Sequence, residues 1–537
     1  MSGPTISARF GRRTHVSVRE FDPNSSEIIG LTTPFDDVVR EETTEEISTA
    51  DADVVRTFTQ QAGPFTAYER MIERGDDGSV RETTTWSVDI PWFWWLFTPL
   101  ISRHFARRRH RATHPWWSPP TVLNTHEVLV LALLAAASMA TAFINTLFTQ
   151  TVTYAAETFG VSEQGQGVAA AIVRVGIVFA IPFAVLGDRI GRRRIVVILS
   201  WVAPVVASLG ALAPSFWLLT ANQTIARPLG LALDVALLVI AIEEMPKDAR
   251  AYGLSILALA NGFGAGIAVA ALPLADAGRN GWRAIYVVSL VWLLVALRLT
   301  RRLNETQRFR RNESFRRETA QKTHRGAPRI LGRPRTFGRD GSVQGTILLV
   351  AFLGNIFLAT ASIFQNRYLK DVRGYSAVLV ATFSLLTTLP SALGLVYGGR
   401  LADDYGRRVV ASTCIPIGAV MIALSFVAHG PLMWVCAIVG GVFAATAYPA
   451  MAVYRGELSP TSKRQTASFL VTVAALLGGS IGLVLGGTLI DHHWSYGTVM
   501  LLFSSVSIVI AALVWFRYPE TAHRELEELN PIDAPPA

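Results

Sequence analysis

The sequence predicts an all-α membrane protein, in which twelve transmembrane helices form two pseudo-symmetric six-helix bundles behind a mostly polar N-terminal extension. Two observations lead to this fold class. Apolar runs of about 20 residues dominate the chain from Glu127 onward, and runs of that length cross a hydrocarbon core about 30 Å thick. Charged motifs between these runs also recur in the same order, which indicates one unit built twice.

Short charged motifs mark this repeat. Asp-Arg-Ile-Gly-Arg-Arg at 188–193 returns as Asp-Asp-Tyr-Gly-Arg-Arg at 403–408, an offset of 403 − 188 = 215. Asn-Glu-Thr at 304–306 returns as Pro-Glu-Thr at 519–521, and 520 − 305 = 215. A third motif, Glu-x-x-Pro-x-x-x-Arg, starts at Glu243 and returns at an offset of 457 − 243 = 214. The chain therefore contains two equivalent halves, an architecture typical of secondary transporters.

Each element follows from the apolar runs and the polar segments between them. The predicted spans are 127–150, 166–187, 195–213, 216–243, 251–274 and 283–300 in the first half, and 345–365, 376–399, 408–428, 431–454, 466–489 and 496–516 in the second. The predicted domains are the extension (1–126), the first bundle (127–300), a basic linker (301–344), the second bundle (345–517) and a tail (518–537).

Charge predicts the orientation. The loop 300–342 holds 13 Lys or Arg against 4 Asp or Glu, and arginines crowd the loops after spans two and eight. The positive-inside rule then places this loop and both termini in the cytoplasm. The first 30 residues contain no apolar stretch that could be a signal peptide, so the N-terminus is expected to stay in the cytoplasm. The predicted location is the cell's cytoplasmic (inner) membrane, as a multi-pass protein. The basic loop is expected to lie beside anionic lipid and not to bind nucleic acid.

The extension has three predicted parts. Residues 1–60 sustain no hydrophobic period and are expected to be disordered. Residues 71–88 are expected to form a β-hairpin around the turn Asp77-Gly78. The Trp-rich segment 91–101 is too short to span a bilayer and is predicted to anchor in the membrane interface. The alternative is a hydrophobic flap packed on a small soluble domain.

The repeated loops are candidates for a conformational latch. Asp188 can cap a helix or pair with arginine, and Gly191 allows a tight reversal. Such contacts form and break at little cost, as a switch between two states requires. From spacing alone, charge that only sets topology is an equal alternative. The candidate latch residues are Asp188, Arg189, Gly191 and Arg192 in the first copy, and Gly399, Asp403, Gly406, Arg407 and Arg408 in the second.

These loops, found twice among twelve spans, resemble the signature of the major facilitator superfamily over residues 127–520. The resemblance implies two six-helix bundles that rock around a central solute path. Two residues depart from the motif: Ala184 stands where the family usually has Gly, and Asp404 stands where the first copy has Arg. Because of Asp404, the second latch is expected to pair differently. The third motif, with Glu243, Arg250, Glu457 and Arg464, and the Pro-Glu-Thr ending look like those of sugar and organic-solute permeases.

Ionisable groups inside a bilayer are expensive, so each is a candidate functional group. Gln223, Arg227 and Asp234 share one face of span four at i, i+4 and i+11. There an arginine can bind an anionic group and a carboxyl can carry a proton. Arg227 also resembles, in part, the superfamily's membrane arginine linked to proton coupling. We therefore take Arg227, Asp234 and Arg174 of span two as candidates for transport or proton coupling, with structural pairing as the alternative.

Polar stripes on other spans supply candidate solute contacts. The resemblance implies that spans one, four, seven and ten line the cavity. Small polar residues packing helices together are the alternative. The candidate cavity residues are Asn145, Thr149, Gln223, Asn355, Gln365 and Tyr448.

We therefore expect a secondary transporter that moves a small organic solute by alternating access and proton symport, and that acts as a monomer. The first alternative is a drug or metabolite exporter of the same fold, working by proton antiport. The second is a non-transporting membrane sensor or scaffold. The sequence has no Gly-Lys-Ser/Thr nucleotide loop and no clustered metal ligands, so we expect no enzyme activity, no cofactor and no metal.

Overall fold

The computed structural model divides the chain into two compact units, residues 1–133 and 134–537. The boundary falls inside one long helix, α3 (Thr125–Phe159). The residues that the structure describes are 14–22, 28–45, 54–74, 79–108 without 89 and 91, 114–161 without 116, 165–306 without 166, 167, 170, 171 and 175, 339–459 without 376, and 464–529.

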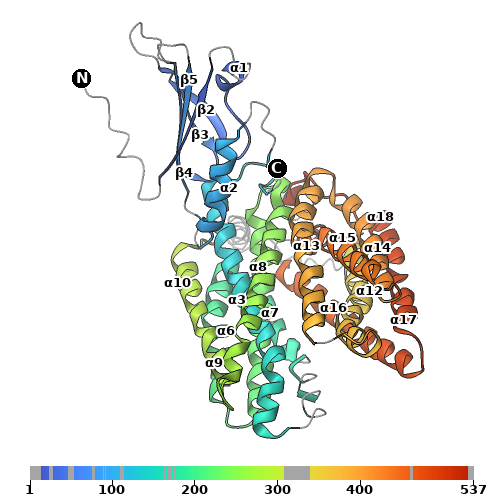
Figure 1. Ribbon diagram of the computed structural model, residues 1–537. Helices are drawn as coiled ribbons and strands as arrows, with labels where there is room; N and C mark the ends of the chain where they lie inside the picture. The colour runs from blue at the N-terminus through green and yellow to red at the C-terminus, as the bar shows by residue number, and fades with distance from the viewer. Residues whose placement is uncertain are drawn as a thin grey trace, which may run out of the picture. The chain divides into compact units, whose positions relative to one another are not determined.

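The first unit is built on a five-stranded antiparallel sheet, with strand order β1-β5-β4-β3-β2 (Figure 1). The hairpin expected at 71–88 is present as β4 and β5, which pair from Phe65↔Val88 to Arg74↔Val80. The predicted turn Asp77-Gly78 lies outside the described residues. The elements are β1 (His15–Phe21), α1 (Ile28–Leu31), β2 (Arg40–Glu45), β3 (Val54–Ala62), β4 (Phe65–Arg74), β5 (Val80–Val88) and α2 (Trp94–Ala106).

The expectation that residues 1–60 are disordered is wrong for β1, β2 and β3, which together supply three of the five strands. These strands are rich in charged and hydroxylated residues, a composition that predicts disordered, solvent-exposed chain. A half-exposed antiparallel sheet tolerates such residues on one face, and its backbone groups are satisfied by the neighbouring strands. On the other face, several of the charges are buried in pairs.

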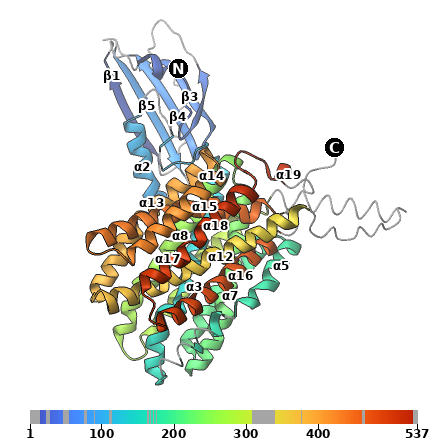
Figure 2. The ribbon, with the colours of Figure 1, turned by 90° about the vertical axis from the view of Figure 1, so that its right-hand side faces the viewer.

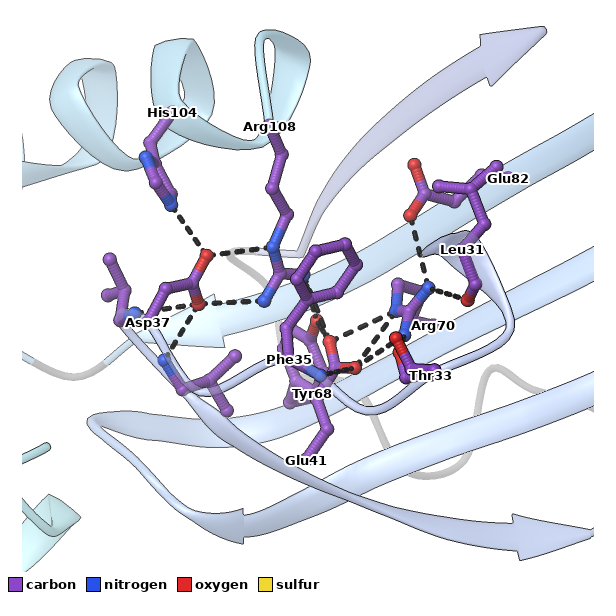
Figure 3. Close-up of polar contacts among 12 residues, drawn as sticks. Leu31, Thr33, Phe35, Asp37, Glu41, Tyr68, Arg70, Glu82, His104 and Arg108 are labelled. Carbon is purple, nitrogen blue, oxygen red and sulfur yellow. Dashed lines mark hydrogen bonds and ion pairs between the residues drawn. The ribbon is translucent and has the colours of Figure 1, made fainter. Parts of the chain in front are cut away.

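These buried charges form a network at one side of the sheet (Figure 3). Arg70 of β4 donates to the Glu41 carboxylate at 2.5 Å and to Glu82 at 3.3 Å. Arg108, which follows α2, donates to Glu41 at 2.9 Å and to Asp37 at 2.7 Å. All five side chains are buried. Arg19 of β1 also donates to Glu82, at 2.6 Å, so three carboxylates face three guanidinium groups and no charge in the network is left uncompensated.

Asp37 lies at the end of this network nearest to α2. His104 of α2 contacts its carboxylate at 2.8 Å, on the same oxygen that accepts from Arg108 Nε. Burial raises the pKa of Asp37, but attraction to Arg108 and hydrogen bonds from His104 and Arg108 outweigh burial and lower the pKa below its ordinary value of 3.8. The folded unit therefore holds Asp37 as a carboxylate.

The Trp-rich segment forms the start of α2 and has two faces. Ile101 and Phe105 are buried against Phe65 and Trp86 of the sheet, as the alternative of a packed flap requires. Trp95 in the first turn is 61% exposed, and Trp94 and Leu96 are also exposed. Anchoring of this first turn in a membrane interface stays a prediction.

The second unit is helical (Figures 1 and 2). Its first half contains η2 (Gly176–Ala180), α5 (Ile181–Ile190), α6 (Arg192–Ser208), η3 (Leu209–Leu212), α7 (Phe216–Glu244), η4 (Lys247–Ala249), α8 (Arg250–Ala270), η5 (Leu272–Ala277), α9 (Trp282–Val288), η6 (Ser289–Trp292) and α10 (Leu293–Arg302). Its second half contains α12 (Arg339–Arg367), η7 (Tyr368–Val372), α13 (Ala377–Asp404), α14 (Arg407–Ser425), α15 (Pro431–Glu457), α16 (Arg464–Asp491), α17 (Tyr496–Ser504), α18 (Val506–Arg517) and α19 (Leu526–Leu529).

Ten helices in the described part of the chain are long and apolar enough to cross a membrane. They correspond to ten of the predicted spans; the prediction 216–243, for example, meets the helix Phe216–Glu244. Span eight corresponds to α13, and the predicted span 166–187 falls partly on residues outside the description and ends in α5. The total of twelve spans stays a prediction, as do the linker's features beyond Thr306.

Helix packing joins the two halves in a reciprocal way. Within the second half, α13 and α14 each pack on α15, and α12 packs on α16 (Figure 2). Between the halves, α8 packs on α13 and α5 packs on α16. The first residues of α8 and α16, Arg250 and Arg464, are 464 − 250 = 214 positions apart in the sequence, which is the offset of the third repeated motif. The contacts between the halves therefore follow the internal repeat.

Candidate functional site

Asp188 lies at the end of α5, and its carboxylate caps a helix of the other half. The backbone N–H groups of Gln465 and Thr466 donate to Asp188 at 3.1 and 2.9 Å, and the Thr466 hydroxyl donates at 2.8 Å. These groups form the first turn of α16, whose N–H groups have no partner within the helix. A carboxylate at this position also interacts favourably with the helix dipole.

Asp403 makes the same contact in the opposite direction. The N–H groups of Ala251 and Tyr252, in the first turn of α8, donate to the Asp403 carboxylate at 3.3 and 3.0 Å. Each half thus offers an aspartate to a helix start of the other half. Gly191 and Gly406, which follow these aspartates, have φ of 110° and 101°, a backbone conformation that favours glycine.

The third motif supplies a second pair of contacts between the halves. Arg464, the first residue of α16, donates to Glu243 at the end of α7 at 2.8 Å. Arg250, the first residue of α8, donates to Glu457 at the end of α15 at 2.9 Å. All four side chains are fully buried. Removing either charge of such a pair would leave the other without its partner in a buried site, which is strongly destabilising.

Arginines of the first motif join these pairs into two clusters. Arg192 lies 3.4 Å from Asp188 and 3.5 Å from Glu243. Arg407 lies 3.1 Å from Asp403 and 2.5 Å from Glu457. We call these sets the first cluster (Asp188, Arg192, Glu243, Arg464) and the second cluster (Asp403, Arg407, Glu457, Arg250). Each contains two carboxylates and two guanidinium groups, so its formal charge is balanced.

The Asn/Pro-Glu-Thr motifs have a role that sequence analysis did not assign. Glu305 accepts from the backbone N–H groups of Arg192 and Arg193, both at 3.1 Å. Glu520 accepts from those of Arg407 and Arg408, at 2.9 and 3.0 Å. The two glutamates therefore cap α6 and α14 within their own halves. Their equal offset in the sequence was the signal that could have indicated this role.

The following threonines complete each cluster. The Thr306 hydroxyl donates to Glu243 at 2.7 Å, and Arg407 donates to the Thr521 hydroxyl at 3.0 Å. One departure from the motif, Asp404, lies next to the second cluster. Asp404 pairs with Arg400 at 3.5 Å on the exposed side of α13, so the changed residue does not replace Asp403 in its contact with α8. The expectation that the second latch pairs differently is therefore wrong: Asp403 contacts the start of α8 as Asp188 contacts the start of α16.

A separate polar site surrounds Asp234 in the middle of α7. Thr141 of α3 and Asn261 of α8 donate to the same Asp234 oxygen, at 3.1 and 3.2 Å. The Arg455 guanidinium, on α15 of the other half, attracts the Asp234 carboxylate electrostatically. Asp234 therefore joins helices of the first half and interacts with a cation of the second. Its hydrogen-bond partners Thr141 and Asn261 were not among the candidate site residues.

Arg227 and Asp234 share a face of α7, but within the described residues no hydrogen bond or ion pair joins them. Asn145 of α3 lies next to Gly230, which is between Arg227 and Asp234 on α7: a Cβ built on Gly230 would lie 2.7 Å from Asn145 Oδ1. Gln223 is fully buried and donates to Asn222 at 2.6 Å and to the Ala207 carbonyl at 3.5 Å. Gln223 thus lies against α6, as a helix-packing residue does.

The remaining candidates are dispersed. Asn355 is half-buried and donates to the Ala351 carbonyl of its own helix at 3.0 Å. Gln365 is half-buried, whereas Thr149 and Tyr448 are exposed within the bundle or at its surface. Their contact with a solute stays a prediction. Over the described residues, there is no group of three or more His, Cys, Asp or Glu side chains that could hold a metal ion.

Comparison with known proteins fits this geometry. A protein of Haemophilus influenzae named for metabolite transport is 25% identical over 360 residues, 66% of this chain and 86% of that protein. The structure of the proton:xylose symporter XylE has a TM-score of 0.63 at 16% identity, covering 75% of this chain and 98% of that one. The E. coli fucose:proton symporter FucP has a TM-score of 0.58 at 18% identity, covering 73% and 99%.

The family profile extends over both halves. The Major Facilitator Superfamily matches residues 130–389 and 379–536, which include both clusters and the Asp234 site. These are membrane transporters and not enzymes. The chain is therefore a multi-pass membrane transporter that belongs to the Major Facilitator Superfamily.

Proposed function

We propose that this protein moves a small organic solute by alternating access, coupled to protons, with the two clusters closing one end of the path. The observation that carries the proposal is the reciprocal contact of Asp188 with α16 and of Asp403 with α8. Because both contacts join the two halves, rocking the halves apart must break both. Opening at the other end can leave both intact, so the clusters bias the choice between two states.

We place the closed end at the cytoplasmic face of a cell membrane. The support is the positive charge of the loops at this end, together with the 13 basic residues of the loop 300–342. Asp188, Arg192 and their second-half equivalents lie at the helix ends that those loops join. On this assignment, the clusters close the path to the cytoplasm while the solute site is open to the outside.

Asp234 is the proposed proton carrier. It lies in a predicted span, accepts hydrogen bonds from two neutral side chains, and interacts with Arg455 across the two halves. A carboxyl in such a site can exchange its proton when the surrounding charges and water change with the conformational state. Because Arg455 belongs to the other half, rocking changes its distance from Asp234. This gives a physical link between proton binding and alternating access.

The direct test is uptake into proteoliposomes with an imposed pH gradient, using a broad panel of labelled solutes. Accumulation that follows an inward proton gradient supports symport. Accumulation that requires the opposite gradient supports the exporter alternative. Deleting residues 1–90 tests the alternative of a non-transporting sensor or scaffold. Unchanged solute flux in the deleted chain would show that transport does not depend on the strands of the sheet unit. No gradient-dependent movement of any solute would contradict the proposal.

A further inference from the structure

Two arginines of the first half, Arg174 and Arg227, belong to segments that touch each other. Arg174 precedes η2, and Arg227 lies in α7. The backbones of these segments touch, since a Cβ built on Gly176 would lie 2.7 Å from the Thr224 carbonyl oxygen. Gly176 is two residues after Arg174, and Thr224 is three residues before Arg227. The Arg174 side chain is exposed, and the Arg227 side chain is half-buried. The charge of Arg174 acts electrostatically on Arg227.

The spans hold little negative charge to balance these arginines. The six predicted spans of the second half contain no Asp or Glu. In the first half, Glu127 and Glu243 lie at span ends, and Asp234 is the carboxylate left in the interior. Asp234 stands 234 − 227 = 7 residues from Arg227, about 10 Å along the helix axis at 1.5 Å per residue. It is already engaged by Thr141 and Asn261.

The polar atoms around Arg227 have unused hydrogen-bonding capacity. Within the described residues, Arg227 Nε is buried and has no hydrogen-bond partner, and the same is true of Asn145 Oδ1. Asn145 faces Gly230, one helical turn from Arg227. A cation buried without a counter-charge is costly, and structures keep such groups where a ligand completes the site. Two guanidinium groups offer the forked donors that bind a carboxylate in a bidentate way.

We infer that Arg174 and Arg227 bind the negatively charged group of the solute, so that the transported substrate is a small organic carboxylate. The inference rests on the proposed transport function and specifies its substrate class. It gives distinct roles to neighbouring charges: the arginines hold the anion, and Asp234 carries the proton. Asn145 Oδ1 is placed to accept a hydrogen bond from a hydroxyl or N–H group of the same solute.

Binding is tested on the purified full chain by its thermal unfolding midpoint. The probes are succinate, lactate and benzoate as carboxylates, xylose and fucose as neutral sugars, and choline as a cation, all at matched ionic strength. At least one carboxylate should raise the midpoint of the unaltered protein, because a ligand that binds only the native state stabilises it. A rise with a sugar or choline but with no carboxylate would overturn the inference.

Variants separate a binding role from a structural one. R174Q and R227Q should each weaken carboxylate binding about tenfold or more, the effect of losing one charge-assisted contact. R227K should lose less, since it keeps the charge but not the fork. Arg194, exposed in the first turn of α6, supplies the matched control R194Q, which should bind normally. Undiminished carboxylate binding by both R174Q and R227Q would refute the assignment.

Uptake into proteoliposomes distinguishes failure of the proposed transport function from failure of the proposed carboxylate site. If carboxylate binding depends on the arginines but no probe is transported, the anion site stands and the transport proposal fails. If a neutral sugar accumulates and carboxylates neither bind nor compete, transport stands and the anion site fails.

Discussion

Glu243 and Arg464 are 221 residues apart in the sequence, and their side chains meet at 2.8 Å in a fully buried site between the two halves. Arg192 approaches the same Glu243 oxygen at 3.5 Å. One carboxylate therefore contacts two guanidinium groups where α7, α6 and α16 meet. The repeated pair, Glu457 and Arg250, shows that this arrangement belongs to the duplicated unit.

Replacing Glu243 by Gln should open the closed end. The substitution leaves Arg192 and Arg464 without that carboxylate, and losing one partner of a buried pair costs about 3–5 kcal/mol. We expect the closed state to lose population by a factor of about 100. A cysteine at Ser255, fully buried on α8, should then react faster with a maleimide. D404N, which removes an exposed carboxylate of the same end, is the control; equal labelling of E243Q and the unaltered chain would contradict the account.

Asp188→Asn should slow solute exchange and leave solute affinity nearly unchanged. The amide can still accept a hydrogen bond from the start of α16, but the charge that favours the helix N-terminus is lost, a change of about 1 kcal/mol or less. Asp403→Asn should act in the same direction through α8. Equilibrium binding and single-turnover exchange, measured on the same preparations, separate the two effects. Weakened affinity at a normal exchange rate would argue against a latch.

Asp234→Asn should abolish accumulation driven by a pH gradient, because an amide cannot carry the proton. Exchange of labelled for unlabelled solute without a gradient should persist, since rocking of the loaded protein needs no net proton movement. The control is D404N, which removes an exposed carboxylate and leaves Asp234 with both of its hydrogen-bond partners. Full gradient-driven accumulation by D234N would remove Asp234 from the coupling mechanism.

The sheet unit should lose stability in acid through Asp37. The pKa of Asp37 is lower in the folded chain than its ordinary value of 3.8, so the folded state binds protons less readily than the unfolded state. Its contribution is therefore fully present above about pH 4 and declines as the pH falls toward the folded pKa. Hydrogen exchange of β2 and β5 in the full chain, followed from pH 5 to pH 3, measures this loss. D37N should be less stable at pH 5 and show a weaker pH dependence; an identical pH profile would contradict the assignment.

Much of the helical architecture could be predicted because it depends on sums over many residues. A mean hydropathy over 18 residues locates a span well even when single residues are atypical, as the agreement of 216–243 with α7 shows. The repeat was readable for a related reason. Equal offsets of Asp188 and Asp403 mark equivalent positions whatever their contacts are.

The partners of individual charges could not be predicted in this way. The contact of Asp188 with Gln465 joins residues 277 positions apart, and helical periodicity gives no information at that distance. Periodicity placed Arg227 and Asp234 on one face of α7 but could not say that Thr141 and Asn261 contact Asp234. Which neighbour a face meets depends on the rotation and packing of whole helices.

The first 60 residues were misjudged for a similar reason. The composition of the strand that contains Glu41 predicts solvent-exposed chain, yet the Glu41 side chain is buried. Its carboxylate accepts hydrogen bonds from Arg70, 29 residues further on, and from Arg108. A charge looks incompatible with a core only while its partner is unknown. Compositional arguments count such residues as disorder-promoting, although pairs of them can be buried together in a sheet.

The most direct test of alternating access is the distance between the halves at the end that holds the clusters. Spin labels at Arg194, in the first turn of α6, and at Tyr405, between α13 and α14, would report it in a chain whose Cys414 and Cys436 are replaced; both positions are exposed. The account predicts a short and a long distance population in lipid nanodiscs, with E243Q shifting molecules to the long one. A single distance distribution, the same with and without E243Q, would contradict it.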